Sequence, residues 1–142
     1  MPKIRVPEIT AYFKSDVKTV WNVVTNNVDY KWRSDIMKIE VYPDGNHWLE
    51  YYNEKTYTKF TLVEKVENNK YVFDLENKMF IGHWTGYFSP TETGGTKVIF
   101  TENILIKNPI IRMMSHLFWD LEKIQKTYLA DLKIKLQEDS NS

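Results

Sequence analysis

Two polar residues, Glu102 and Gln125, occupy positions where the surrounding pattern is apolar. Glu102 belongs to an alternating apolar strand face, which is formed by Val98, Phe100, Ile104 and Ile106. Burial on such a face would raise the pKa of the carboxyl and make it a candidate general acid or base near neutral pH. The alternatives are a bulge that turns Glu102 outward, or a buried ion pair with a lysine or arginine. Glu50, which alternates with Trp48 and Tyr52, is a second case of the same pattern.

Gln125 falls near the centre of an apolar stripe at helical spacing, between Leu121 and Tyr128. A buried amide needs partners for up to four hydrogen bonds. Gln125 therefore either contacts a polar group of a ligand or is satisfied within the core. A small rotation of the helix, which would expose Gln125 to water, is the third alternative.

The other residues that commonly carry chemistry are badly spaced or absent. The three histidines, His47, His83 and His116, form no His-Glu-x-x-His or other metal-ligand spacing. The chain has no cysteine, so disulfides, thiolate catalysis and zinc–cysteine sites are excluded. There is no P-loop and no Gly-x-Gly-x-x-Gly motif. We expect no metal and no cofactor, and Glu102 is the one catalytic candidate.

The elements that must position these residues are mostly strands. The pattern predicts a first strand over residues 3–14, broken near Pro7 because proline cannot donate to a ladder. Ser15-Asp16 then predicts the start of a short helix, and a second short helix or turn is expected over 29–33. Six further strands, separated by turn signals such as Asp44-Gly45, are expected over 37–42, 47–52, 57–66, 71–75, 79–88 and 96–107.

The chain closes with a long amphipathic helix, expected over residues 108–137 with Asn108 as cap and Pro109 in the first turn. At 100° per residue one stripe collects Met114, Phe118, Leu121, Gln125, Tyr128, Leu132 and Leu136. A long helix laid across a curved sheet encloses a space. That space is either a packed core or a pocket for an apolar ligand.

Length and charge limit the remaining possibilities. The chain has 142 residues, which predicts one domain over 1–138 followed by a polar tail over 139–142. Lys plus Arg and Asp plus Glu are 19 each, and this balance argues against a nucleic-acid partner. The N-terminal residues do not resemble a signal peptide, and no apolar run reaches the length of a membrane span. We expect a cytoplasmic protein without stable membrane insertion; the oligomeric state is not predicted.

The order of these elements, together with several short motifs, resembles the START-like helix-grip superfamily (SRPBCC), and within it the polyketide cyclase/dehydrase and lipid-transport type. The residues that carry the resemblance are Ser15-Asp16, Val20-Trp21, Gly82-x-Trp84, Phe88-x-Pro90, Gly95-Thr96-x-Val98 and Leu129-x-x-Leu132-Lys133. The resemblance covers nearly the whole chain. It implies an α+β helix-grip fold: a curved seven-stranded antiparallel sheet wrapped around a long C-terminal helix, with two short helices after the first strand.

The resemblance also implies a cavity between sheet and helix that takes apolar small molecules or lipids. The residues expected to line it are Phe80, Trp84, Phe88, Phe100, Glu102, Met114, Leu117, Phe118, Leu121 and Gln125. Gly82 and Gly86 flank Trp84, and they either leave room for a ligand or allow the sheet to bend.

Three functions remain open at this point. The first is binding, and with it transport, of a hydrophobic small molecule or lipid, and the absence of a catalytic constellation favours it. The second is a cyclase or dehydratase that uses Glu102, with Gln125 or a tyrosine as partner. The third is a protein-interaction or co-chaperone-like module with a filled core. A fold alone does not decide among them.

Overall fold

The structure is a computed structural model that describes residues 3–107 and 111–138, with the side chains of 111–119 left out of the description. Its elements follow the predicted order, except that one short helix instead of two follows the first strand. They are β1 (Lys3–Phe13), α1 (Val17–Thr25), β2 (Lys38–Val41), β3 (His47–Tyr51), β4 (Tyr57–Val66), β5 (Lys70–Glu76), β6 (Phe80–Pro90), β7 (Thr96–Ile106) and α2 (Ile111–Lys135).

The strands form one seven-stranded antiparallel sheet in the order β1-β7-β6-β5-β4-β3-β2. The predicted meander is thus confirmed, and β1 completes the sheet beside β7. The Asp44-Gly45 hairpin is also confirmed; Gly45 has a φ of 73°, a left-handed conformation that glycine adopts without steric cost. The register of β1 shifts between Val6 and Ile9, which confirms the irregularity expected at Pro7.

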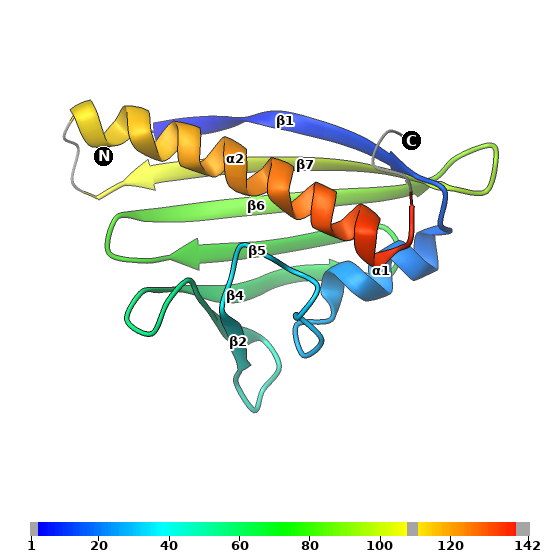
Figure 1. Cartoon of the computed structure of the whole chain (residues 1–142), viewed down its shortest axis with the longest axis horizontal. Coiled ribbons are helices and arrows are strands. Elements are labelled where there is room, and N and C mark those ends of the chain that lie inside the picture. The colour runs from blue at the N-terminus through cyan, green and yellow to red at the C-terminus, as the bar shows by residue number, and fades with distance from the viewer. Residues whose placement is uncertain (1–2, 108–110, 139–142) are drawn as a thin grey trace.

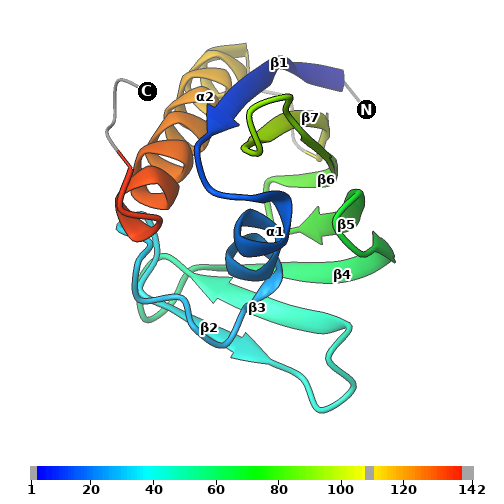
Figure 2. The same cartoon turned by 90° about the vertical axis from the view of Figure 1, so that its right-hand side faces the viewer.

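The curved sheet and α2 form two layers. Figure 1 shows α2 running along one face of the sheet, and Figure 2 shows the strands curving around that helix while α1 covers one end. The face of α2 that meets the sheet includes Leu121, Gln125 and Leu132, all buried. Just beyond the helix, the Glu138 carboxylate accepts hydrogen bonds from the backbone N–H groups of Lys14 and Ser15. Within the described part of the chain, no helix is long and apolar enough to cross a membrane.

One helix follows β1, and the expectation of a second short helix over 29–33 is wrong. α1 begins as predicted, because Asp16 Oδ1 accepts a hydrogen bond of 2.8 Å from the Thr19 N–H. After α1, Asn26 Oδ1 accepts from the N–H groups of Val28 and Asp29, at 3.0 and 3.2 Å. Such local side-chain bonds compete with helix formation, so residues 26–37 run as a series of turns.

Candidate functional site

A cavity of about 740 Å³ lies between the concave face of the sheet and α2. Its walls are mainly aromatic rings on the inward faces of β3 to β7, and these are Trp48, Phe60, Tyr71, Phe73, Trp84 and Phe100. On the other side α2 contributes Leu121, Ile124, Gln125 and Tyr128. Ligand pockets commonly have volumes of roughly 300–1,000 Å³ and mostly apolar walls with a few polar groups. The cavity has the size and the lining of such a pocket.

The cavity has one open end. Its exposed lining residues come from the β3–β4 turn, the β5–β6 turn and the first half of α2; they include Lys55, Thr56, Lys78, Met79 and Ile124. These segments lie at the left of Figure 1, whereas α1, which contributes Val24 to the lining, lies at the right. A ligand would therefore enter between the two turns and α2.

Glu102 faces this cavity from β7 and is 7% exposed. It lies in register between Val6 of β1 and Trp84 of β6. The bulge beside it is in β1, so β7 keeps its alternation and the carboxyl stays inward. Two cavity-lining cations are engaged elsewhere, Arg33 with Glu50 and Lys107 with Glu76. No ion pair reaches Glu102 from the described residues, so neither alternative considered for it applies.

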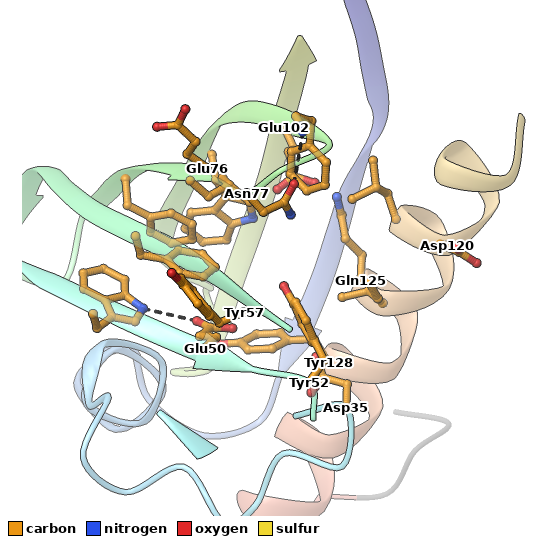
Figure 3. A pocket seen from close by; sticks show the side chains of 18 of the residues that line it. Asp35, Glu50, Tyr52, Tyr57, Glu76, Asn77, Glu102, Asp120, Gln125 and Tyr128 are labelled. Carbon is orange, nitrogen blue, oxygen red and sulfur yellow. Dashed lines mark hydrogen bonds between the residues drawn. The ribbon is translucent and has the colours of Figure 1, made fainter. Parts of the chain in front are cut away.

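Burial raises the pKa of Glu102 to about 7, with the nearby Gln125 amide opposing the rise and the charge of Glu50 adding to it. Gln125 is itself 8% exposed. Neither its Oε1 nor its Nε2 makes a hydrogen bond of normal geometry with a described residue. Figure 3 shows Gln125 extending from α2 toward Glu102. The cavity therefore holds a buried amide without a normal hydrogen bond, close to a buried carboxyl that no described cation pairs with.

A second polar cluster, around Arg33, is fully paired. Arg33 Nη1 lies 3.0 Å from Glu50 Oε1, and Nη2 lies 2.9 Å from Asp35 Oδ2. The guanidinium also sits 5.1 Å from the ring centroid of Tyr128, and Trp48 Nε1 donates to Glu50 Oε2 at 3.2 Å. Burial alone would lower the pKa of Arg33, but the charges of Glu50 and Asp35 raise it above its ordinary value. Glu50 thus has the buried ion pair that Glu102 lacks.

Two tyrosines of the lining remain protonated at neutral pH. Burial raises the pKa of Tyr71 to about 12 and that of Tyr128 well above its ordinary value. Asn27 Nδ2 donates to the Tyr71 hydroxyl at 3.4 Å. Both phenols can donate hydrogen bonds to a polar group in the cavity.

The predicted lining residues are only partly brought together. The residues that do line the cavity are Phe80, Trp84, Phe100, Glu102, Leu121 and Gln125. Phe88 does not, because Trp21 of α1 packs against it with ring centroids 5.0 Å apart. Three further predicted residues have side chains outside the described part of the structure, and these are Met114, Leu117 and Phe118.

The glycines that flank Trp84 do not leave room for a ligand. A Cβ on Gly86 would lie 2.5 Å from Cη2 of the Trp84 indole, and one on Gly82 would lie 2.8 Å from Cδ1 of Ile104. The space above each glycine is therefore filled by a neighbouring side chain. The indole of Trp84 lies flat against the strand because Gly86 has no side chain.

Sequence reasoning missed the Arg33 cluster, which closes the inner part of the cavity. Arg33 ends the segment expected to form a second short helix or turn, Asp35 follows just after it, and no spacing in the sequence links either residue to Glu50. The alternation of Glu50 with Trp48 was the one available signal. Of the histidines whose side chains are described, neither lines the cavity: His47 contacts Asp44 of the β2–β3 turn, and His83 is exposed and contacts Asp74. The side chain of His116 lies outside the described part of the structure.

Comparison with known proteins supports the fold through structure alone. No family model and no curated protein matches the sequence. A START superfamily protein from Mycobacterium smegmatis is 16% identical, with a TM-score of 0.66 and coverage of 94% of both chains. Ara h 8.0201 is 12% identical, with a TM-score of 0.72 and coverage of 96% of this chain and 100% of the other.

A third similar structure is the di-domain ARO/CYC protein StfQ from the steffimycin biosynthetic pathway. It is 12% identical, with a TM-score of 0.76, and the match covers 93% of this chain and 50% of StfQ. At these identities the likeness concerns the backbone arrangement and not the site residues. The chain therefore has the START-like helix-grip fold, as the resemblance in its sequence predicts.

Proposed function

We propose that this protein binds a largely apolar small molecule in the cavity between the sheet and α2. The observation that carries the proposal is a cavity of about 740 Å³ with aromatic walls, opening at one end of the molecule. A core built only for stability would fill such a space, because protein interiors pack as densely as organic crystals. Similar structures include a START superfamily protein and an ARO/CYC protein, which is consistent with a ligand cavity in this fold.

The walls favour an apolar ligand for an energetic reason. Burial of apolar surface contributes about 25 cal/mol per Å², so a ligand that hides about 300 Å² of apolar surface gains roughly 7 kcal/mol. The loss of translational and rotational freedom opposes this gain. The net binding free energy that remains is suitable for reversible binding, which transport or presentation of a small molecule requires.

The test is to block the cavity mouth from α2. Ile124 lines the opening, and Ile134 lies on the same helix but away from the cavity, where it is 70% exposed. We expect Ile124→Trp to weaken binding of the apolar fluorophore Nile red by about tenfold or more, since each 1.4 kcal/mol of lost contact is tenfold. The matched variant Ile134→Trp should bind as the wild type does.

Native mass spectrometry of the freshly purified protein complements this titration. A small-molecule adduct that disappears on denaturation, and is reduced in Ile124→Trp, would support the proposal. Equal Nile red binding by both tryptophan variants would place the dye outside the cavity. If the folded protein then also carried no adduct, the proposal would fail.

A second candidate function is catalysis on a ligand in the same cavity, and the state of Glu102 favours it. A carboxyl whose pKa lies near 7 can both give and take a proton at neutral pH. The protonated Tyr71 and Tyr128 could hold a substrate carbonyl by hydrogen bonding. A carbon-detected NMR titration that found an ordinary pKa for Glu102 would count against this use.

The third candidate, an interaction module with a filled core, has less support. Its defining feature is the absence of a cavity, whereas the described residues enclose one.

A further inference from the structure

We propose that the ligand is an amphipathic amine, with its ammonium group held between Glu102 and Gln125 and its apolar body among the aromatic rings. The inference rests on the proposed function and names the class of ligand. It is carried by two side chains, each more than nine-tenths buried, that line the cavity: the Gln125 amide has no hydrogen-bond partner of normal geometry among the described residues, and no described cation forms an ion pair with Glu102.

The donor and acceptor chemistry of this pair suits an ammonium group. Glu102 offers carboxylate oxygens and Gln125 offers an amide oxygen, whereas an ammonium carries three donors and no acceptor. A buried acceptor left unpaired is costly, and hydrogen bonds to charged groups are stronger than neutral ones. A primary amine would provide partners for both side chains at once, and Figure 3 shows them extending toward each other from opposite walls.

The charge of the inner cavity points the same way. Three carboxylates face it or close it, those of Asp35, Glu50 and Glu102, against the single guanidinium of Arg33. Ionised Glu102 therefore leaves an excess of two negative charges in a poorly solvated space. The other acidic lining residues, Glu76 and Asp120, are exposed, and their carboxyl groups point away from the inner cavity (Figure 3). An anionic headgroup would be repelled from the inner cavity, and a cationic one would offset the excess.

Aromatic rings occupy neighbouring positions of the cavity wall. Trp84 lies directly opposite Glu102 in the β6–β7 register, and its ring centroid is 4.8 Å from that of Phe100. Phe100 in turn lies 6.3 Å from Tyr128 on α2. The faces of such rings attract cations, most strongly where water is excluded. Rings and carboxylate together form a site for a desolvated ammonium group.

The experiment compares three fluorescent probes that differ in their headgroup: pyrenebutylamine, pyrenebutanol and pyrenebutyrate. Binding is followed at pH 8 by energy transfer from the tryptophans to pyrene. At this pH the amine is protonated and Glu102 is ionised. We expect the amine to bind about tenfold or more tightly than the alcohol, as a charged hydrogen bond implies, and the butyrate to bind most weakly.

Glu102→Gln, which keeps the shape of the side chain, should remove most of the preference for the amine and leave the affinity for the alcohol within about threefold, a difference below one 1.4 kcal/mol step. The control is Glu92→Gln in the exposed β6–β7 turn, which should retain the preference. Circular dichroism of each variant establishes that it is folded.

Three outcomes would overturn the inference. Equal affinity for the amine and the alcohol would show that the site does not recognise the charge of the headgroup. Tighter binding of the butyrate would show that the site prefers an anion. An amine preference that persisted in folded Glu102→Gln would place the cation elsewhere. In each case the cavity would still bind an apolar probe and the proposed function would stand. Failure of all three probes to bind would contradict both the amine inference and the proposed function.

Discussion

The two buried glutamates of this protein show how a neighbouring side chain decides the state of a carboxyl. Glu50 and Glu102 are 6% and 7% exposed. Glu50 forms an ion pair with Arg33 and accepts a hydrogen bond from Trp48. Glu102 has the Gln125 amide nearby and no cation from the described residues, so burial raises its pKa. Of these two glutamates, Glu102 is the one whose carboxyl has no ion pair among the described residues and can therefore interact with a polar group of a ligand.

This difference makes stability depend on pH. Because the pKa of Glu102 rises from 4.5 to about 7 on folding, the native state holds this proton to higher pH than the unfolded chain does. Its contribution to the free energy of unfolding should therefore fall as the pH rises from about 4.5 to about 7, by on the order of 3 kcal/mol. Glu102→Gln should lack this fall, as measured by urea unfolding across the pH range.

The exposed Glu92→Gln serves as the control, and its unfolding curve should follow that of the wild type at every pH. The gap between Glu102→Gln and the wild type should widen with pH and then become constant above about pH 7. Parallel curves for the wild type and Glu102→Gln would mean that the carboxyl is not buried in solution.

At the scale of the element, β6 depends on a glycine to seat a tryptophan. The Trp84 indole covers Gly86, so that a Cβ at this position would lie 2.5 Å from the indole Cη2 and 3.3 Å from Cδ1 of Phe100. Trp84 also stacks on Phe73 of the neighbouring strand, with ring centroids 4.6 Å apart. The ring cannot move without disturbing that contact and the cavity wall.

Gly86→Ala should therefore displace the indole and destabilise the protein by about 1–3 kcal/mol, as overpacking of a core generally does. The change should appear in chemical unfolding and in the near-ultraviolet circular dichroism of the aromatic rings. Thr85→Ala, one residue away on the opposite face of β6, is the control and should alter the spectrum much less. An unchanged spectrum for Gly86→Ala would show that the indole does not lie against the strand.

At the scale of the whole molecule, the apolar core that stabilises the fold and the cavity proposed to bind the ligand lie in different places. The sheet, α1 and the C-terminal part of α2 contribute to a continuous apolar core, whereas the space between the sheet and the middle of α2, at residues 120–128, is a cavity. Voids are lost on unfolding, so they make a folded protein sensitive to pressure. A ligand that fills the cavity removes that sensitivity and adds its own binding free energy.

We therefore expect pyrenebutanol at about one hundred times its Kd to raise the free energy of unfolding by about 2.7 kcal/mol. The pressure at which half the protein unfolds should rise as well, because the ligand occupies volume that unfolding would otherwise release. Pressure-dependent tryptophan fluorescence measures both effects. At the same ligand concentration the Ile124→Trp variant, with its binding weakened about tenfold or more, should gain about 1.4 kcal/mol or less; a full response in this variant would locate the binding site outside the cavity.

Much of the architecture could be predicted from local sequence. Alternation along 96–107 placed Glu102 among inward residues, the Asp44-Gly45 turn placed a hairpin, and the spacing of Leu121, Gln125 and Leu132 identified the buried face of α2. Each of these features belongs to a single strand, turn or helix, and it is determined by residues that are close together in the sequence. The expected lining followed from them, except where Trp21 of α1 covers Phe88.

The sequence by itself determined the order and type of most elements, because periodicity and turn chemistry act over a few residues. It also placed a carboxyl and an amide within apolar patterns, but it left open whether either side chain faces inward. Only the tertiary structure decided that Arg33 pairs with Glu50 while Glu102 is left unpaired, since these residues meet through folding of the turns between α1 and β2. It likewise decided that the space between sheet and helix is a cavity, because its volume depends on how side chains from seven elements meet.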